Sequence, residues 1–337
     1  MNVLRRLLGL TQTETTKVSP DNTSATTVDM PDSSMLADTL PSESTLIQEE
    51  SAATVQEKPG FGATRQLPPL ESALTRPNQH ITYGQSTDVG MVRSNNQDSL
   101  LTFFATQGNT DNMPDFGVFI VADGMGGHHD GEKASAIATR VLAEEVTRKI
   151  YLPMLQGNKE ETDAAQPTIS EILAEAVRTA NDVVVKSVPE GGTTITAAAI
   201  IGDLAYIVHV GDSRAYLVTK EYGLEQITRD HSLVQRLIEL DQLTSEEASQ
   251  HPQKNVLYRA IGQSDNLEVD AITRRLPPES YLLLCSDGLW NMVSEEQLMD
   301  IIMNAESPQE ACNRMVAIAN EYGGPDNISA ILIQIPD

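Results

Sequence analysis

The chain has 337 residues, of which 40% are hydrophobic, so it can bury one large core or two small ones. Acidic residues outnumber basic ones 48 to 23, and the formal charge of -25 argues against nucleic acid or an anionic membrane surface as a partner. Two cysteines, Cys285 and Cys312, are too few for a disulfide framework or a cysteine-rich zinc site, and both lie in apolar stretches typical of reduced core residues.

The first 80 residues are predicted to be a disordered tail. The segment "TQTETTKVSPDNTSATTVDMPDSS" is rich in Ser, Thr, Asp and Pro and has almost no apolar periodicity, so it cannot bury enough surface to offset the entropy of ordering. Thr15 and Thr16 are candidate phosphorylation sites for a phosphothreonine-binding partner, although an inert tether is the simpler interpretation. The start "MNVLRRLLGL" lacks a signal-peptide cleavage site, and no apolar run approaches the ~20 residues of a membrane span, so we expect a cytoplasmic protein.

From Ile81 onward the pattern predicts a folded domain of residues 81–337. Short apolar runs bounded by turn residues predict strands, and apolar residues at helical spacing predict helices. The strands are expected at 100–107, 116–123, 193–201, 204–212, 213–220, 267–276, 280–287 and 327–335. The helices are expected at 131–151, 168–188, 231–240, 244–249, 294–304 and 307–323.

These elements do not alternate strictly between strand and helix. Helix pairs and runs of strands favour an α+β fold, with antiparallel sheet and helices segregated outside it. The turns at Gly202-Asp203 and Gly211-Asp212 are very short, and we therefore expect the strands at 193–201, 204–212 and 213–220 to be antiparallel neighbours.

Four aspartates lie at the ends of the predicted strands. Three of them, Asp123, Asp212 and Asp287, end apolar runs, and Asp326 immediately precedes the last strand. Converging carboxylates repel one another unless a cation lies between them, and oxygen ligands favour Mg²⁺ or Mn²⁺. For any single aspartate, ordinary turn chemistry is the competing interpretation.

The stretch "FIVADGMGGHHDGEKAS" fits a tight turn, a nucleotide-binding loop or half of a metal site. It lacks the G-x-G-x-x-G spacing, because His129 occupies the sixth position counted from Gly124. Glycine at position 124 would let a backbone carbonyl approach a cation. His128 and His129 invite a zinc site, but no third soft ligand has suitable spacing, so loop histidines are favoured.

Six segments in order resemble the motifs of the metal-dependent protein phosphatases of type 2C. They are "TDVGMVRSNNQDS", "VADGMGGHHDGEKAS", "GGTTITAAAI", "HVGDSRAYLV", "LLLCSDGLWNMVS" and "GGPDNISAILI". The resemblance runs from about Ile81 to Ile335. It implies a four-layer α-β-β-α sandwich of two stacked antiparallel sheets flanked by helices. It also implies Mn²⁺- or Mg²⁺-dependent hydrolysis of phosphoserine and phosphothreonine in proteins.

Carried over residue by residue, the resemblance assigns a metal site. Asp123 bridges two metals, and the Gly124 carbonyl binds one of them. Asp287 and Asp326 complete the other metal. Asp212, together with Asp287, supports a third, weaker metal of the kind expected in bacterial members.

Further positions receive roles from the same resemblance. Asp98 holds a metal-bound water, and Arg93 clamps the substrate phosphate with its planar fork, although a lone arginine would otherwise be taken for a surface residue. Met125 stands where some members carry a general-acid histidine, which places the chain in the bacterial branch. Thr193 and Thr194 are expected to line the strand behind the site.

Two loops are assigned in the same way. Asn327 is expected to fix its own loop by hydrogen bonds. Residues 228–262 resemble the bacterial flap beside the active site, with His251 and Arg259 as candidate substrate contacts.

The expected mechanism is one-step, in-line attack on phosphorus by a metal-activated water, without a phosphoenzyme. The expected partners are phosphorylated proteins and an opposing serine/threonine kinase, and a monomer is the default because no heptads are present. Two rivals are a non-catalytic scaffold and a phosphatase dedicated to one partner. A two-metal nuclease is disfavoured by the charge of -25.

Overall fold

The computed structural model describes residues 80–106, 113–126, 130–156 and 167–337. The predicted tail, apart from His80, lies outside the described residues, as do Thr15, Thr16, His128 and His129. Among the helices that the structure describes, none combines the length and the apolar character needed to cross a membrane.

Two five-stranded antiparallel sheets form the centre of this part of the chain. The first has the order β1-β12-β11-β8-β9 and the second the order β10-β7-β6-β3-β2. The first sheet comprises β1 (Thr82–Asp88), β12 (Ile328–Gln334), β11 (Tyr281–Cys285), β8 (Arg214–Thr219) and β9 (Gly223–Gln226). The second comprises β10 (Asp270–Arg275), β7 (Leu204–Val210), β6 (Ile195–Ile201), β3 (Phe116–Ala122) and β2 (Ser99–Ala105). A short ribbon pairs β4 (Gly124–Met125) with β5 (Gly192–Thr193).

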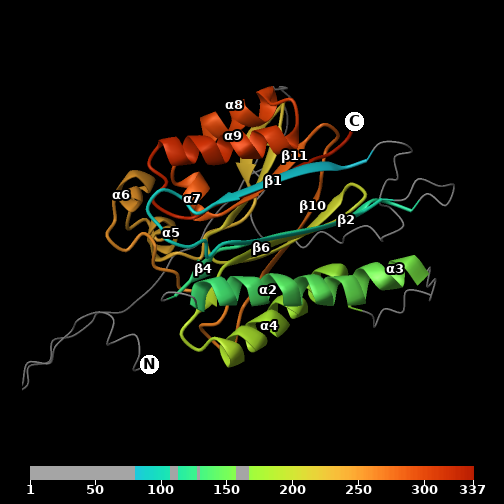
Figure 1. Ribbon diagram of the computed structural model, residues 1–337, viewed down its shortest axis with the longest axis horizontal. Helices are drawn as coiled ribbons and strands as arrows, with labels where there is room; N and C mark the ends of the chain where they lie inside the picture. Colours follow the sequence, from blue (N-terminus) through green and yellow to red (C-terminus); the bar gives the residue numbers. More distant parts are fainter. Residues whose placement is uncertain (1–79, 107–112, 127–129, 157–166) are drawn as a thin grey trace, which may run out of the picture. The chain divides into compact units, whose positions relative to one another are not determined.

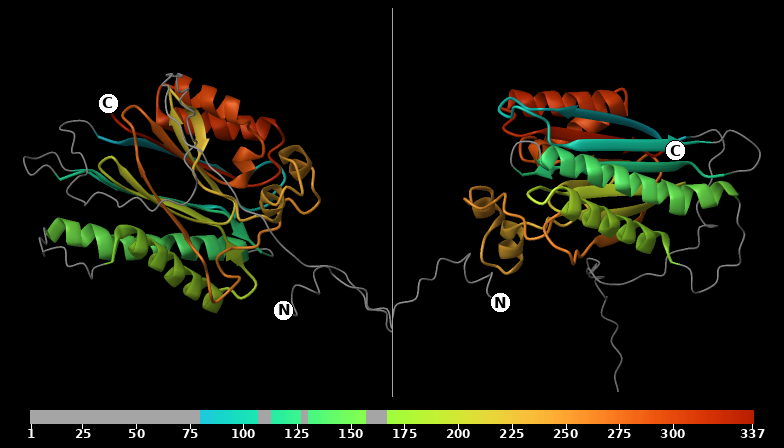
Figure 2. Two further views of the ribbon diagram at one scale, coloured as in Figure 1. Left: turned by 180° about the vertical axis from the view of Figure 1, so that it is seen from behind. Right: turned by 60° about the horizontal axis from the view of Figure 1, so that its bottom comes forward.

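Helices cover the outer face of each sheet (Figure 1). The helices α2 (Asp130–Val146) and α4 (Ile169–Ser187) lie on the second sheet, and α8 (Glu295–Asn304) and α9 (Pro308–Glu321) lie on the first. The two views of Figure 2 show the same four layers. A π-helical turn (Thr147–Tyr151) joins α2 to α3 (Leu152–Gln156), and shorter helices are α5 (Leu233–Glu239), α6 (Ser245–Ser249) and α7 (Asp287–Trp290). The predicted α-β-β-α sandwich is therefore confirmed.

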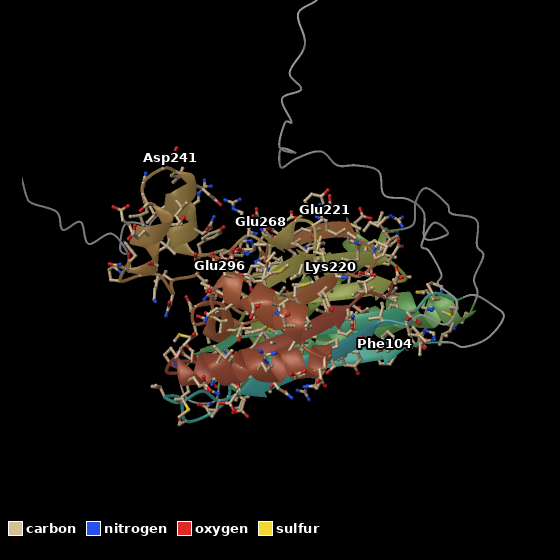
Figure 3. The ribbon with its side chains drawn as sticks, turned by 90° about the horizontal axis from the view of Figure 1, so that it is seen from above. Phe104, Lys220, Glu221, Asp241, Glu268 and Glu296 are labelled. Atoms are coloured by element: carbon tan, nitrogen blue, oxygen red, sulfur yellow. The ribbon has the colours of Figure 1, made fainter. Side chains whose placement is uncertain are left out.

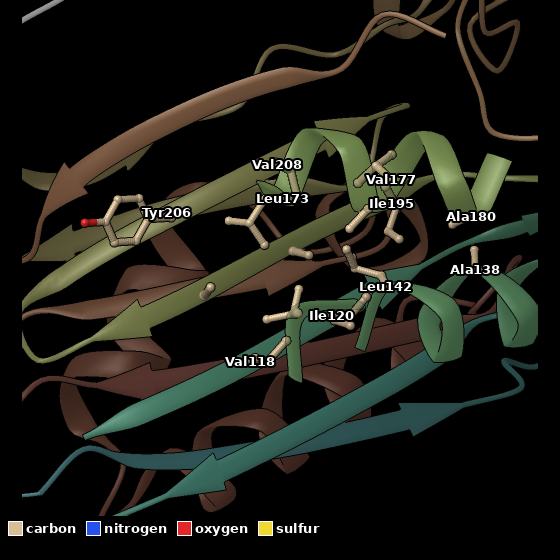
Figure 4. Close-up of a cluster of buried hydrophobic side chains, with 14 of the residues drawn as sticks. Val118, Ile120, Ala138, Leu142, Leu173, Val177, Ala180, Ile195, Tyr206 and Val208 are labelled. Carbon is tan, nitrogen blue, oxygen red and sulfur yellow. The ribbon is translucent and has the colours of Figure 1, made fainter. Parts of the chain in front are cut away.

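Apolar side chains fill the three interfaces between these layers. In β3 every residue is buried, and successive residues point to opposite faces. Val118 and Ile120 pack in the cluster between the second sheet and the helices α2 and α4 (Figure 4), whereas Phe119 and Val121 pack between the two sheets. The continuous apolar run that ends at Asp123 thus follows from burial on both sides.

Cys285 and Cys312 are both free and buried in the third interface, between the first sheet and α8 and α9. The prediction of two reduced core cysteines is confirmed.

One predicted strand pairing is wrong. The strands β6 and β7 are antiparallel neighbours, but β8 leaves the second sheet and pairs with β9 and β11 in the first. Gly211 has a φ of 113°, and the turn from Gly211 to Ser213 redirects the chain across the sandwich. A short connection therefore carries the strand to the other sheet instead of closing a hairpin.

The sequence analysis also missed β1, whose sequence "TYGQSTD" is mostly polar. It is an edge strand that pairs along its whole length with β12. Its buried residue is Gly84, where an added Cβ would lie 2.3 Å from the Gln309 backbone. Because α9 packs directly on this glycine, the strand carries little apolar signal.

Candidate active site

Five aspartates meet at one end of the sandwich, where β3 and β7 end and β2, α7 and β12 begin. In Figure 1, β4 and α7 mark this end. Burial raises the pKa of Asp123 well above its usual range, and the charges of four neighbours raise it further. These four neighbours are Asp98, Asp287, Asp212 and Asp326. The aspartates that the sequence singled out are therefore brought together.

Burial is the main cause of the raised carboxyl pKa values here. It raises the pKa of Asp98 to about 7, and burial followed by the nearby charge of Asp326 raises that of Asp287 to about 6. Burial, and then the charge of Asp287, also raises the pKa of Asp212 well above its usual range. Held ionised without a counter-charge, such a cluster would oppose folding.

Two carboxylate oxygens in this cluster lack a partner. Asp98 Oδ1 and Asp287 Oδ1 are enclosed and accept no hydrogen bond within the part of the chain described. Both residues are partly accessible as a whole, but these atoms are shielded from solvent. Within the described residues, no group of three or more His, Cys, Asp or Glu side chains is placed so that it could already hold a metal ion. A hard divalent cation would satisfy the orphaned oxygens and offset the repulsion, so the residues fit a metal centre.

The hydroxyl groups of Ser286, Thr193 and Thr194 hold Asp98 and Asp123 in place. Ser286 Oγ donates to Asp98 Oδ2 at 2.7 Å and accepts from the backbone N–H of Ser329 at 3.0 Å. The Asp123 N–H donates to Thr194 Oγ1 at 2.9 Å, and Thr193 Oγ1 donates to the Asp123 carbonyl at 2.9 Å. The threonines therefore line the strand behind the site, as predicted. Ser286 and Ser329 were missed.

Gly124 lies where three segments of backbone converge. An added Cβ would lie 2.3 Å from the carbonyl oxygen of Gly131 and 2.5 Å from that of Gln97. The Gly124 N–H donates to the same Gln97 oxygen at 3.1 Å. Glycine is required here by backbone crowding, which is a different reason from the cation access expected from the sequence.

Arg93 and Asn327 organise the opposite wall of the site. Arg93 Nη2 donates to Asp326 Oδ2 at 2.6 Å while half of the arginine side chain stays exposed. Asn327 Oδ1 accepts from the Gln97 N–H at 2.8 Å, and its amide group donates to the carbonyls of Val89 and Asn95. Asn327 fixes the loop by hydrogen bonds, as predicted.

The flap, residues 228–262, carries α5 and α6 and lies at the same end as α7 (Figure 1). Its tip, marked by Asp241 in Figure 3, points away from the sheets. Arg259 is bound at 2.8 Å to both Asp270 and Glu268 at the base of the flap, and this is a different role from the expected substrate contact. His251 Nδ1 accepts a bond from the Gln253 N–H at 3.2 Å.

One flap residue that the sequence did not single out acts on the site. Lys254 is exposed, and its positive charge opposes the burial that raises the pKa of Asp287. In the sequence, Lys254 could have been noticed only as a lone lysine within the long, partly acidic segment 228–262. Met125 lies in β4, and Gln263 Nε2 contacts its sulfur at 3.5 Å, so this position offers no proton donor.

The sequence model of the family "Protein phosphatase 2C" matches residues 92–332. The chain belongs to this family. The predicted family is confirmed, and the matched range contains every candidate site residue. The serine/threonine phosphatase stp of Listeria monocytogenes serotype 4b is 38% identical over 248 residues, which are 74% of this chain and 93% of that protein. The protein phosphatase PhpP of Streptococcus pneumoniae is 36% identical over 250 residues, covering 74% and 95% of the two chains.

Solved structures of bacterial phosphatases have the same fold. The serine/threonine phosphatase PstP/Ppp of Mycobacterium tuberculosis has a TM-score of 0.63 and 30% identity, covering 76% of this chain and 99% of that one. The S. agalactiae serine/threonine phosphatase has a TM-score of 0.64 and 31% identity, covering 76% and 100%. The PstP catalytic domain in complex with two manganese ions has a TM-score of 0.61 and 30% identity, covering 76% and 99%.

Proposed function

We propose that this chain hydrolyses phosphoserine and phosphothreonine in proteins with the help of bound Mn²⁺ or Mg²⁺. The observation that carries the proposal is the group of five buried or half-buried aspartates, two of which have orphaned oxygens, in a chain of the 2C phosphatase family. The manganese ions of the PstP complex support this choice of metal.

The proposed ligands of two cations are Asp123, the Gly124 carbonyl, Asp287 and Asp326, with Asp98 acting through a water. Asp212 and Asp287 would hold a third, weaker cation. When bound, such ions lower the pKa of water to give a nucleophile near neutral pH and neutralise charge on the phosphoryl oxygens.

The protein's own groups then orient the reactants. Arg93 is directed toward the cluster by Asp326 and offers a planar fork to the phosphate oxygens. Thr193 and Thr194 hold the Asp123 backbone on both sides, and Ser286 fixes one oxygen of Asp98. Met125 has no proton to donate, so the general acid of this enzyme does not lie at position 125.

Four finer statements stay predictions from the sequence: an opposing serine/threonine kinase, a cytoplasmic location, a monomer, and a disordered tail of residues 1–80 before the catalytic domain. Size-exclusion chromatography with light scattering tests the monomer. The opposing kinase would be identified as one that phosphorylates the same serine or threonine that this enzyme dephosphorylates.

Phosphate release from a phosphothreonine peptide tests the function, with Mn²⁺, with Mg²⁺ and with chelator. Mn²⁺-dependent release that disappears in Asp123→Asn would support the proposal. Folded protein that releases no phosphate with any metal would overturn it. Release from one phosphoprotein and from no generic peptide would favour a phosphatase dedicated to that partner.

A further inference from the structure

The turn that carries Asp212 is held by an aromatic side chain from α7. Trp290 Nε1 donates to the Asp212 carbonyl oxygen at 3.0 Å. The guanidinium carbon of Arg214 lies 3.6 Å from the centroid of the Trp290 ring, which is the geometry of a cation–π contact. Since α7 begins at Asp287, Trp290 fixes the Asp212 turn relative to a second aspartate of the site.

The same arginine is bound to the root of the flap. Arg214 Nε and Nη2 donate to both oxygens of Asp230 at 2.7 to 3.1 Å, and Nη1 donates to the Tyr216 hydroxyl at 2.9 Å. The side chains of Arg214 and Asp230 are only 18% and 5% exposed. A forked ion pair of this burial allows little relative movement, because a displaced partner would leave an unpaired buried charge.

A second connection lies one residue away from the first. The Gly211 N–H donates to His231 Nδ1 at 3.0 Å, and the His231 N–H donates to the Gly211 carbonyl at 2.7 Å. On the other side of the ring, His231 Nε2 lies 3.2 Å from Asp270 Oδ2 and 3.0 Å from Arg259 Nη1. Residues 211–214 and 230–231 are thus joined twice in succession.

The far end of the flap returns to the same place. The Tyr258 N–H donates to the His231 carbonyl at 2.9 Å, and Arg259 Nη1 donates to Asp270 Oδ1 at 2.8 Å. Both ends of the flap therefore meet at His231. Between them lies Lys254, whose charge acts on Asp287.

We propose that Arg214, Asp230, His231 and Trp290 form a flap clasp that couples the Asp212 carboxylate to the position of the flap. Trp290 and Arg214 are then positioning residues for the cation that Asp212 would hold. A cation bound at the Asp212 carboxylate would move the Asp212 backbone, whose carbonyl is hydrogen-bonded to Trp290. Because Trp290 contacts Arg214 and Arg214 is paired with Asp230, this movement would be passed on to the flap. This inference rests on the proposed function only in requiring a divalent cation at Asp212.

Trp290 is the single tryptophan of the chain, so its fluorescence reports on the flap clasp directly. The full-length protein is titrated with Mn²⁺, which is paramagnetic and quenches a nearby indole, and in parallel with Mg²⁺. We expect a second, weaker phase of Mn²⁺ quenching that is absent from Asp212→Asn. Mg²⁺ is not paramagnetic, so it does not quench the indole directly. Its binding at Asp212 should still change the emission, because the indole N–H is bonded to the Asp212 carbonyl.

Trypsin cleavage of the Lys254–Asn255 bond, scored by mass spectrometry, reports on the flap. We expect Mn²⁺ to slow this cleavage in the wild type. In Trp290→Phe, which keeps a ring for Arg214 but loses the N–H donor, the Mn²⁺ concentration for half-protection should rise about five- to tenfold, the size expected for one net hydrogen bond. Arg214→Lys, which loses the fork, should behave similarly. The control is Tyr281→Phe, which removes one hydroxyl at the other end of β11.

Equal Mn²⁺ protection in the wild type, Trp290→Phe and Arg214→Lys would overturn the coupling. Should those two variants fail to fold, unchanged protection in Asp212→Asn would overturn it as well. Neither readout requires catalysis. If the protein released no phosphate but its flap still responded to Mn²⁺ in this way, only the proposed phosphatase function would be refuted. If the enzyme were active but its flap did not respond, only the flap clasp would be refuted.

Discussion

The guanidinium group of Arg93 donates a 2.6 Å hydrogen bond to the carboxylate of Asp326, 233 residues away in sequence. Half of the arginine side chain is exposed, and the charges of Asp123 and Asp287 also stabilise its protonated form. The carboxylate cluster thus orients the Arg93 guanidinium group at the edge of the site. A phosphate group arriving there would exchange with Asp326 for the arginine, so substrate binding and the freeing of Asp326 oxygens are linked.

Arg93→Ala is expected to lower kcat/KM for a phosphothreonine peptide by about 100-fold or more, the usual cost of losing one donor to developing charge. Arg93→Lys should recover only part of the loss, because an ammonium group lacks the fork. Steady-state phosphate release measures both variants. Arg178→Ala is the control, since it removes an exposed pair with Glu175 on α4. A kcat/KM unchanged in Arg93→Ala would exclude the phosphate clamp.

Asp123→Asn should lower turnover about a thousandfold, equal to about 4 kcal/mol, because an amide weakens both cations that Asp123 is proposed to bridge. Calorimetric titration should show fewer Mn²⁺ ions bound per chain. The control is Asp115→Asn, which breaks the pair with His80 outside the site. An unchanged kcat at saturating Mn²⁺ would show that Asp123 does not bridge the metals.

The metal-free protein should lose stability as pH rises. The pKa values of Asp98 and Asp287 lie at about 7 and about 6, above the ordinary 3.8, because burial penalises the charged form. The native state therefore holds more protons than the unfolded state between about pH 4 and pH 7, and its stability is lost progressively through that window.

Thermal unfolding in chelator should accordingly give a Tm that falls between about pH 4 and pH 7. Mn²⁺ favours the ionised carboxylates and should flatten or reverse this slope. Asp98→Asn should have a shallower slope in chelator than the wild type. A Tm that rises with pH in chelator would mean that the aspartates are already stabilised as anions by other groups.

Local patterns predicted much of this fold and site. The helix at Ile169–Ser187 was expected from its apolar periodicity, and in the structure it begins with a capping box made by Thr168 and Glu171. Asp123 and Asp287 follow fully or largely buried strands, so an abrupt end to an apolar run was a reliable signal. These features depend on neighbours in sequence, which is why they can be read from it.

Other features depend on contacts between distant segments and gave no local signal. The strand β8 joins the other sheet because its partners are β11 and β9, which the turn after Gly211 does not specify. Ser286 was overlooked because a serine before Asp-Gly resembles a turn residue, and its partner Asp98 is 188 positions away. Lys254 was overlooked because its charge comes near Asp287 only once the flap is folded.

Gly124→Ala and Gly223→Ala separate crowding from backbone strain. The new methyl at position 124 would lie 2.3 Å from a backbone carbonyl, whereas at position 223 it meets nothing within 4 Å but the φ of 78° is strained. We expect Gly223→Ala to lower the free energy of unfolding by about 1 kcal/mol, and Gly124→Ala to lower it by roughly 3 kcal/mol or more, since backbone must move. Urea unfolding measures both. Equal losses would show that the segments around Gly124 can separate freely.

Ser286→Ala and Ser280→Ala distinguish a role at the site from a role in folding. Both serines are buried at opposite ends of β11, and each donates one hydroxyl bond, Ser286 to Asp98 at 2.7 Å and Ser280 to the Pro277 carbonyl at 2.6 Å. Each substitution should lower the free energy of unfolding by about 1 to 3 kcal/mol, because a buried acceptor loses its partner. Only Ser286→Ala should raise the Mn²⁺ concentration for half-maximal phosphate release, by about tenfold, since Asp98 is then free to turn. If the two variants showed the same Mn²⁺ dependence, Ser286 would be a folding residue and Asp98 would be positioned by other groups.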